Sequence, residues 1–409
     1  MDKKFVSEFL RGSAAATIGS VASMAFHFVS IMLLTRYLSK EDFGLYILIV
    51  LTAYLFNIFG GLGLEITLTK FISSDTEQNK PSIFATTIIA RAVPLILVLI
   101  IFSFVSELVI EAIDKRILEY IALIPILIII VNYRDLFNNL MQGLKLFKHL
   151  ASTQIISALI RVSLILAAVV TGELTLTNLV YIEIISVLVA LVMQFIVIPF
   201  KPLLPFKPSY KIFKKLIAFS FPLYLNNLLT FAYDRINLLI IGIYLTAESV
   251  ANYDVADKIP DALKKLFYSF IVVYFPHSAN LFAEKKLEDA RKLMNKSLIT
   301  ISIILSFGVM LAFILRNEIV GIIFSEAYIG ASFAFALLML NFYLRAISNI
   351  LGYSLVSAGF STTSIKTNSV ASVVSIGGSL LLIPIYGYIG AVYSLLAMNI
   401  VSQIIYLGF

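Results

Sequence analysis

Charged side chains interrupt the long apolar stretches of this sequence, and they are its best candidates for chemistry. Within a membrane, such a charge is costly unless it faces a cavity or a partner. The basic candidates are Arg91, Arg134, Arg161, Arg235, Lys258, Lys264, Lys265 and Arg345. The acidic candidates are Glu65, Asp135, Glu183, Asp234, Asp254, Asp257 and Asp261. A set of this size is out of place in a bundle that only packs, so we predict a charged interior.

Arginine at such positions suits phosphate binding, because guanidinium stays protonated and its N–H fork matches phosphate oxygens bidentately. The predicted phosphate-binding residues are Arg91, Arg134, Arg161, Arg235, Lys258, Lys264 and Arg345. The alternative is pairing with buried carboxylates, and the predicted charge-balancing or coupling acids are Glu65, Asp135, Glu183, Asp234, Asp254 and Asp257. Asp135 and Asp234 each adjoin an arginine in sequence. Neighbours project about 100° apart on a helix, which favours pairing across helices instead.

Six charged residues between positions 254 and 265 fall at helical intervals of three and four. Asp254, Asp257, Lys258, Asp261, Lys264 and Lys265 would form one stripe about 16 Å long. Pairing of Asp254 with Lys258, and of Asp261 with Lys264 or Lys265, would neutralise much of it. Paired or not, the stripe must face protein or water rather than lipid.

Amide and hydroxyl groups near position 230 form a second kind of candidate. Asn226, Asn227 and Tyr233 are suited to sugar recognition, although hydrogen bonding between helices is the commoner role for such residues. No catalytic residue is predicted. The sequence has no cysteine, and His27, His149 and His277 are scattered, so no metal site is predicted either.

The elements that carry these residues are membrane-spanning helices. Hydrophobic residues make up 60% of the 409 residues and charged residues only 13%, against about a quarter in soluble domains. Apolar runs near 20 residues recur, each long enough to cross about 30 Å of hydrocarbon. The predicted spans are 12–35, 43–68, 82–107, 118–142, 148–170, 177–200, 214–244, 249–278, 294–315, 329–357, 365–385 and 388–409. The fold class is therefore an all-α polytopic membrane protein with about twelve transmembrane helices, and a short surface helix is expected within 279–293.

One stretch occurs twice. Tyr37-Leu38-Ser39-Lys40-Glu41-Asp42-Phe43-Gly44-Leu45-Tyr46 is echoed by residues 244–253, Tyr-Leu-Thr-Ala-Glu-Ser-Val-Ala-Asn-Tyr. Two unrelated helix starts would share some of this capping chemistry. We favour an internal duplication, which predicts two pseudo-symmetric six-helix lobes. The proline-rich segment 201–213 divides them, giving an N-lobe at 1–200 and a C-lobe at 214–409.

Lysine and arginine in the short loops set the orientation. With the N-terminus inside, far more of these residues fall on the cytoplasmic side than on the outer side. Both termini are therefore expected in the cytoplasm, in a multi-pass protein of the cell membrane.

Several of these residues resemble the polysaccharide-biosynthesis flippases of the multidrug, oligosaccharidyl-lipid and polysaccharide exporter superfamily. The resemblance rests on Arg11-Gly12-Ser13, on Asp42-Phe43-Gly44-Leu45-Tyr46, on Gln142-Gly143-Leu144-Lys145 before the span with Arg161, and on Ala358-Gly359 and Leu382–Ala391. It runs nearly end to end, and although no single motif is specific, the order and spacing of the motifs together are. Members have up to fourteen spans, so a chain that stops within its twelfth is expected to be short or truncated.

The resemblance implies a transporter rather than an enzyme. It would carry a polyprenyl-(pyro)phosphate-linked oligosaccharide from the cytoplasmic to the outer leaflet by alternating access. Membrane lipids are implied partners, with a polysaccharide polymerase or glycosyltransferases as further candidates, and nucleic acid is not. No cofactor is expected, and Na⁺ or H⁺ coupling stays open. The alternatives are a cation-coupled multidrug antiporter of the same superfamily, or a polytopic glycan polymerase or ligase.

Overall fold

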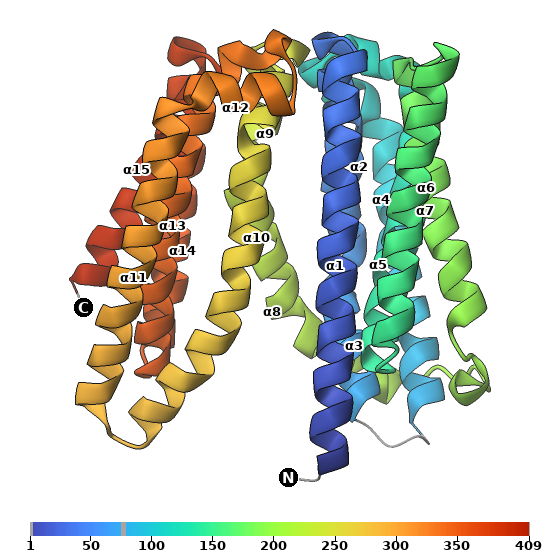
Figure 1. Cartoon of the computed structure of the whole chain (residues 1–409). Coiled ribbons are helices and arrows are strands. Elements are labelled where there is room, and N and C mark those ends of the chain that lie inside the picture. The colour runs from blue at the N-terminus through green and yellow to red at the C-terminus, as the bar shows by residue number, and fades with distance from the viewer. Residues whose placement is uncertain (1–2, 75–78, 409) are drawn as a thin grey trace. The chain divides into compact units, whose positions relative to one another are not determined.

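A computed structural model describes the backbone of residues 3–74 and 79–408, and their side chains except at 3–16, 232, 233, 361, 364 and 365. Every regular element in these ranges is a helix, which confirms the all-α class (Figure 1). Ten of the described helices are long and apolar enough to cross a membrane, or eleven with one bent pair. The remaining predicted span, 118–142, is a 3₁₀ helix followed by helix α5 (Ile124–Gly143), whose second half is polar.

Contacts divide the chain into two compact units, Met1–Thr230 and Phe231–Phe409. The first unit contains α1 (Lys3–Tyr37), α2 (Lys40–Gly61), α3 (Leu64–Ser74), α4 (Lys80–Ile113), η1 (Lys115–Tyr120), α5, α6 (Phe147–Thr171), α7 (Leu176–Val197), η2 (Lys201–Leu203) and most of α8 (Tyr210–Asp234). The second contains α9 (Ile236–Tyr244), α10 (Ala247–Ala283), α11 (Leu287–Ile314), α12 (Arg316–Ile323), η3 (Glu326–Ala331), α13 (Ser332–Ser357), α14 (Ser361–Tyr386) and α15 (Tyr388–Leu407). The separate surface helix expected within 279–293 is wrong, because α10 and α11 extend into that segment from both sides.

The division between the units falls inside α8, after the expected linker 201–213. The start of α8 packs on the first unit, where Leu216 joins Leu64 and Ala90 in a buried cluster. The ring of Phe219 packs edge to face against that of Phe71. Lys70 Nζ lies 3.6 Å from the centroid of the Phe219 ring. The connector before α8 is also fixed, because Leu203 is buried and the backbone N–H of Ser209 donates to Thr86 Oγ1.

Two of the predicted spans are broken. Span 43–68 is interrupted between α2 and α3, where Leu62 and Gly63 adopt left-handed φ angles of 50° and 67°. A Cβ on Gly63 would lie 2.7 Å from the carbonyl oxygen of Ser220, so the position also requires glycine for its contact with α8. Span 214–244 is likewise broken into α8 and α9, which are bent by 45°.

Both copies of the repeated stretch begin a helix in the same way. Ser39 Oγ accepts a hydrogen bond from the Asp42 N–H before α2, and Thr246 Oγ1 accepts one from the Ser249 N–H before α10. Each hydroxyl satisfies a backbone donor that the first helical turn leaves open. Both stretches thus show the capping chemistry that two unrelated helix starts would share, and superposition of the two lobes stays a prediction.

In the first unit, a glycine allows α1 to approach α6 closely, and hydrogen bonds order the loop after α4. A Cβ on Gly19 of α1 would lie 2.4 Å from Ala151 Cβ of α6, so glycine permits this close approach. In the loop after α4, Arg116 donates to Asp114 at 3.0 and 2.7 Å and also to Glu41 at the start of α2. These hydrogen bonds hold the pKa of Asp114 below its usual value.

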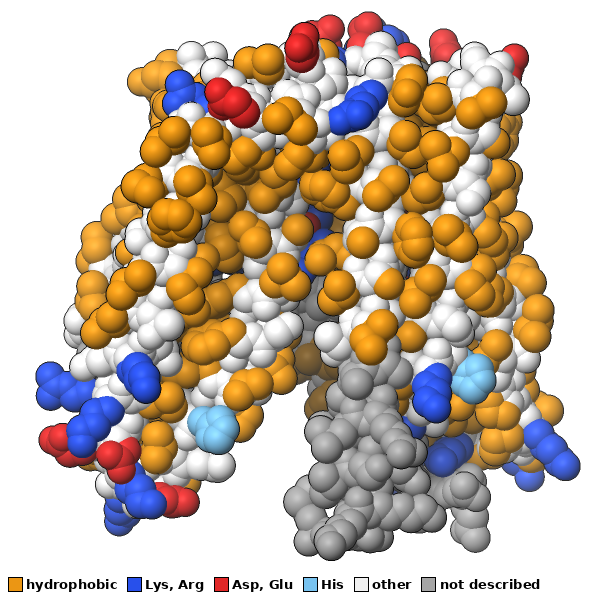
Figure 2. All heavy atoms as spheres, in the orientation of Figure 1, with side chains coloured by type: hydrophobic (Ala, Val, Ile, Leu, Met, Phe, Trp, Pro, Cys, Tyr) orange, Lys and Arg blue, Asp and Glu red, His pale blue; other side chains and the backbone are white. Residues whose placement is uncertain are grey.

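The outer surface matches a membrane environment. Hydrophobic side chains cover the middle of the face shown in Figure 2, whereas charged side chains gather at its two ends. Many of the exposed large residues are apolar, among them Phe104, Val170 and Ile303. Such a band is stable in lipid and would be an aggregation hazard in water.

Candidate functional site

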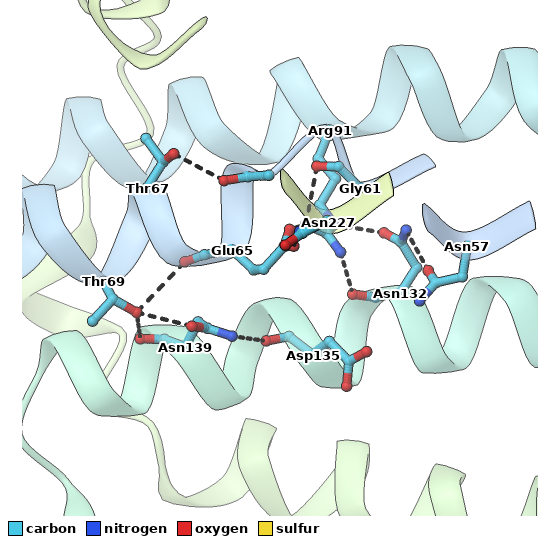
Figure 3. Close-up of polar contacts among 11 residues, drawn as sticks. Asn57, Gly61, Glu65, Thr67, Thr69, Arg91, Asn132, Asp135, Asn139 and Asn227 are labelled. Carbon is cyan, nitrogen blue, oxygen red and sulfur yellow. Dashed lines mark hydrogen bonds and ion pairs between the residues drawn. The ribbon is translucent and has the colours of Figure 1, made fainter. Parts of the chain in front are cut away.

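Arg91 of α4 is the centre of a buried polar network in the first unit (Figure 3). Its Nε donates to Asn132 Oδ1 at 2.6 Å, and its Nη2 donates to the Asn132 carbonyl at 3.0 Å. Its Nη1 donates to Glu65 Oε2 at 2.8 Å and to the Gly61 carbonyl at 3.4 Å. Asn57 accepts from Asn132 Nδ2 at 2.8 Å, which extends the network to α2.

This network stabilises the break in the second span. A helix that ends at Gly61 leaves carbonyl groups without partners, and Arg91 donates to one of them. The carboxylate of Glu65 also accepts from Asn227 Nδ2 at 3.2 Å, which ties α8 to the same point. The Arg91 side chain is only 2% exposed and makes four hydrogen bonds to protein groups. Phosphate contact by Arg91 stays a prediction, but in this structure its donors serve the protein.

A second buried cluster joins α2, α6 and α7 of the first unit. Arg161 Nη2 of α6 donates to the hydroxyl of Tyr46, and that hydroxyl donates to Glu183 Oε2 of α7 at 2.7 Å. The Nε of Arg161 lies 3.1 Å from the same carboxylate oxygen but is not aligned for a hydrogen bond. Tyr46 belongs to the repeated stretch, so the repeat places a hydroxyl between these two charges.

Arg134 and Asp135 correct one expectation. They pair with each other, with Nε and Nη2 of Arg134 at 3.0 and 2.8 Å from Asp135 Oδ1. The prediction that these sequence neighbours would pair across helices is wrong here, because the long arginine side chain can bend back to the adjacent carboxylate. Both side chains are about 30% exposed near the middle of α5.

The second unit has its charges at and near the other broken span. Asp234 is the last residue of α8, and Arg235 lies between α8 and α9. Arg345 Nη1 of α13 donates to Asp234 Oδ1 at 2.7 Å, which confirms pairing across helices for this acid. Arg235 is 4.0 Å from Asp261 of α10, a loose contact.

The stripe on α10 is paired largely as expected. Lys258 Nζ lies 2.7 Å from Asp254, and Asp261 is 3.2 Å from Lys264 and 2.9 Å from Lys265. Lys264 also lies 3.7 Å from Asp257. Among the charged residues predicted within spans of the second unit, five are cations, Arg235, Lys258, Lys264, Lys265 and Arg345, and four are carboxylates, Asp234, Asp254, Asp257 and Asp261. Among the predicted site residues of the first unit, Arg91, Arg134 and Arg161 pair with Glu65, Asp135 and Glu183.

The proposed sugar-contact residues fall into three environments. Asn227 donates to Glu65 and so takes part in the Arg91 network. Asn226 is exposed, and its backbone carbonyl accepts from Thr230. The side chain of Tyr233 lies outside the described residues.

The buried asparagine side chains were not predicted from the sequence. Asn57 and Asn132 complete the Arg91 network, and Asn341 accepts from Asn399 Nδ2 at 2.7 Å in the second unit. Asparagine within an apolar run was the available signal, because membrane spans seldom bury an amide without a partner. In the described part of the chain, no group of His, Cys, Asp or Glu is placed to hold a metal ion.

Comparison with known proteins identifies the family to which this chain is similar. Residues 9–282 match the family model described as polysaccharide biosynthesis protein. A probable low-salt glycan biosynthesis flippase, Agl15 from Haloferax volcanii, is 25% identical over 190 residues, which are 45% of this chain and 39% of that protein. The match therefore spans less than half the length of that relative.

Solved structures share the fold. The lipid II flippase MurJ superposes with a TM-score of 0.77 at 15% identity, covering 96% of this chain and 86% of that one. A multidrug resistance MATE family transporter of the MOP superfamily gives 0.76 at 12% identity, covering 94% and 93%. At these identities the comparison establishes a common fold.

Proposed function

Because the chain belongs to the polysaccharide biosynthesis protein family, we propose that it is a flippase for a polyprenyl-(pyro)phosphate-linked oligosaccharide. It would take the head group from the cytoplasmic leaflet and release it at the outer leaflet by alternating access of its two units. The family match, the glycan flippase relative and the fold shared with a lipid II flippase support this proposal.

The observation that carries the proposal is the excess of cations in the second unit. Arg235, Lys264, Lys265 and Arg345 keep between 21% and 61% of their side chains exposed, although Arg235 lies at the break between α8 and α9 and the other three belong to helices of membrane-spanning length. Half-exposed cations cannot face hydrocarbon at such positions, so they face water or a ligand. A pyrophosphate group carries the opposite charge and accepts several hydrogen bonds, which suits the two arginines.

A multidrug antiporter is the rival with the same architecture. A carrier of cationic drugs needs carboxylates that remain available to the drug, whereas each carboxylate of the α10 stripe has a basic residue within 4 Å. The cation excess therefore favours an anionic substrate. The coupling ion stays open, and glycosyltransferases or a polymerase remain proposed partners.

Transport of a labelled probe tests the proposal directly. Purified protein reconstituted into liposomes should move fluorescent undecaprenyl diphosphate-linked N-acetylglucosamine between leaflets, measured by loss of fluorescence on adding an impermeant quencher. Fluorescent phosphatidylcholine, which lacks both sugar and diphosphate, serves as the matched control lipid and should not move faster than in empty liposomes. Movement of ethidium but not of the sugar-bearing probe would instead support the antiporter.

Orientation is tested by labelling in cells of a chain that has no native cysteine. Lysine is concentrated near the loops that join α3 to α4 and α7 to α8, which predicts that these loops are cytoplasmic. Lys207→Cys should therefore react with an impermeant maleimide only after the cells are opened, whereas Glu173→Cys should react in intact cells. Both positions are exposed in the structure. The reversed pattern would refute the proposed direction of transport together with the cytoplasmic termini.

A further inference from the structure

The second half of α5 presents a continuous polar face. Asp135, Asn138 and Asn139 are half-buried, and Gln142 is exposed. The opposite face of the same segment is buried and apolar, with Leu136, Phe137, Leu140 and Met141 at 3% exposure or less. We call Asp135, Asn138, Asn139 and Gln142 the α5 strip.

The α5 strip does not point in the same direction as the exposed apolar residues of the helix. At about 100° per residue, its four members span an arc of about 100°. Ile126 and Ile129, which are 43% and 38% exposed, project roughly to the other side. Exposed isoleucines suit lipid, whereas exposed amides and a carboxylate do not. The α5 strip must therefore face water or a polar ligand.

Neighbouring helices hold the α5 strip in place. Thr69 Oγ1 of α3 donates to the Asn139 carbonyl at 2.8 Å and lies 3.1 Å from Asn139 Oδ1 (Figure 3). Gln194 Nε2 of α7 donates to Asn138 Oδ1 at 2.8 Å. Side chains fixed in this way lose little freedom when they bind a ligand, which raises affinity.

A buried acceptor beside the α5 strip has no partner among the described residues. Gln194 is 1% exposed, and within the described residues no donor reaches its Oε1. A buried acceptor without a partner is costly unless water or a ligand supplies the donor. The charge of Asp135 is matched by Arg134, so the region offers neutral donors and acceptors rather than net charge.

We propose that the α5 strip binds the sugar hydroxyl groups of the transported head group. Each sugar hydroxyl both donates and accepts, and amide side chains offer both functions side by side. This inference rests on the proposed function and assigns the sugar to a surface within the first unit.

Two lipid probes separate the sugar from the diphosphate. Affinities for undecaprenyl diphosphate and for undecaprenyl diphosphate-linked N-acetylglucosamine are measured on the full-length protein by native mass spectrometry. Asn138→Ala/Gln142→Ala should lower the affinity for the sugar-bearing probe by about tenfold and leave that for the sugar-free probe within about twofold. The matched control is Gln403→Ala, which removes a half-buried amide bonded to the Leu344 carbonyl in the second unit and should change neither affinity.

Each outcome is decisive. Equal losses for both probes, or no loss for either, would overturn the role of the α5 strip and leave the proposed function standing. A wild-type protein that binds neither probe more tightly than phosphatidylglycerol would overturn the proposed function, and this inference with it.

Cysteine accessibility provides a second measurement that does not depend on the double variant. Gln142→Cys and Asn139→Cys should react with a charged thiol reagent in proteoliposomes, and the sugar-bearing probe should slow the reaction. Met141→Cys, on the buried face, and Ile129→Cys, on the exposed apolar face, are the controls and should stay unreactive. Protection of Gln142→Cys by the sugar-free probe to the same degree would refute a sugar-specific site.

Discussion

Replacing Arg91 with alanine is expected to remove most of the folded protein from the membrane. The substitution leaves Glu65 charged and largely buried, and it deprives Asn132 and the Gly61 carbonyl of their donor. Removing one partner of a buried ion pair typically costs about 3–5 kcal/mol, a large part of the stability of a domain. The measurement is the yield of monodisperse protein on size exclusion and its apparent Tm, each compared with wild type.

Two further variants identify the cause of this loss. Arg91→Lys keeps the charge but cannot reproduce four hydrogen bonds from one side chain, so it should restore the yield only in part. Arg91→Leu/Glu65→Gln removes both charges and should be more stable than Arg91→Ala, because no unpaired charge is then buried. If Arg91→Ala instead gave a stable protein that no longer transports, Arg91 would be a substrate ligand rather than a support of the α2–α3 break.

The sequence was sufficient for the architecture because the membrane allows few solutions. Apolar runs of span length can only be helices in lipid, and the twelve predicted segments all contain helices in the structure. The repeated stretch was also informative, since Ser39 and Thr246 are side chains whose short-range capping geometry follows from local sequence. Pairing along α10 followed from helical spacing for the same reason.

The partners of charged residues on other helices could not be predicted from the sequence. Nothing local indicates that Glu65 belongs to Arg91, or that Tyr46 lies between Arg161 and Glu183, because these contacts depend on how separate helices pack. The break at Leu62 was not predicted, because glycine is common in membrane spans and its presence does not by itself indicate a break. Arg134 was misjudged because backbone direction alone ignores the reach of a flexible side chain.

Burial separates the two kinds of arginine in this chain. Arg91 is enclosed by protein, whereas Arg345 keeps 24% of its side chain exposed and pairs with an Asp234 that is 29% exposed. A partly exposed charge pair within an apolar helix needs water or a polar ligand beside it, so we expect Arg345 to have a function beyond packing. An arginine side chain therefore supports the fold at the first broken span, and we expect another to bind a ligand near the second.

Replacing Arg345 with alanine should abolish transport while leaving the protein folded. If Arg345 binds the diphosphate bidentately, its loss removes about 3 kcal/mol of binding, and flipping of the sugar-bearing probe should fall about a hundredfold. Arg345→Lys should recover part of the rate, because a point charge lacks the fork geometry. Arg316→Ala, which removes an arginine that donates to the Phe313 carbonyl at the end of α11, is the matched control and should retain full transport.

The double variant Asp234→Asn/Arg345→Ala decides between binding and structure. If Arg345 only neutralises Asp234, removing both charges should restore transport, because no unpaired carboxylate remains. If Arg345 binds diphosphate, the double variant should be as inactive as Arg345→Ala although its yield and apparent Tm match wild type. Recovered flipping in the double variant would show that Arg345 does not bind the diphosphate. The excess of cations in the second unit would then no longer support the proposed function.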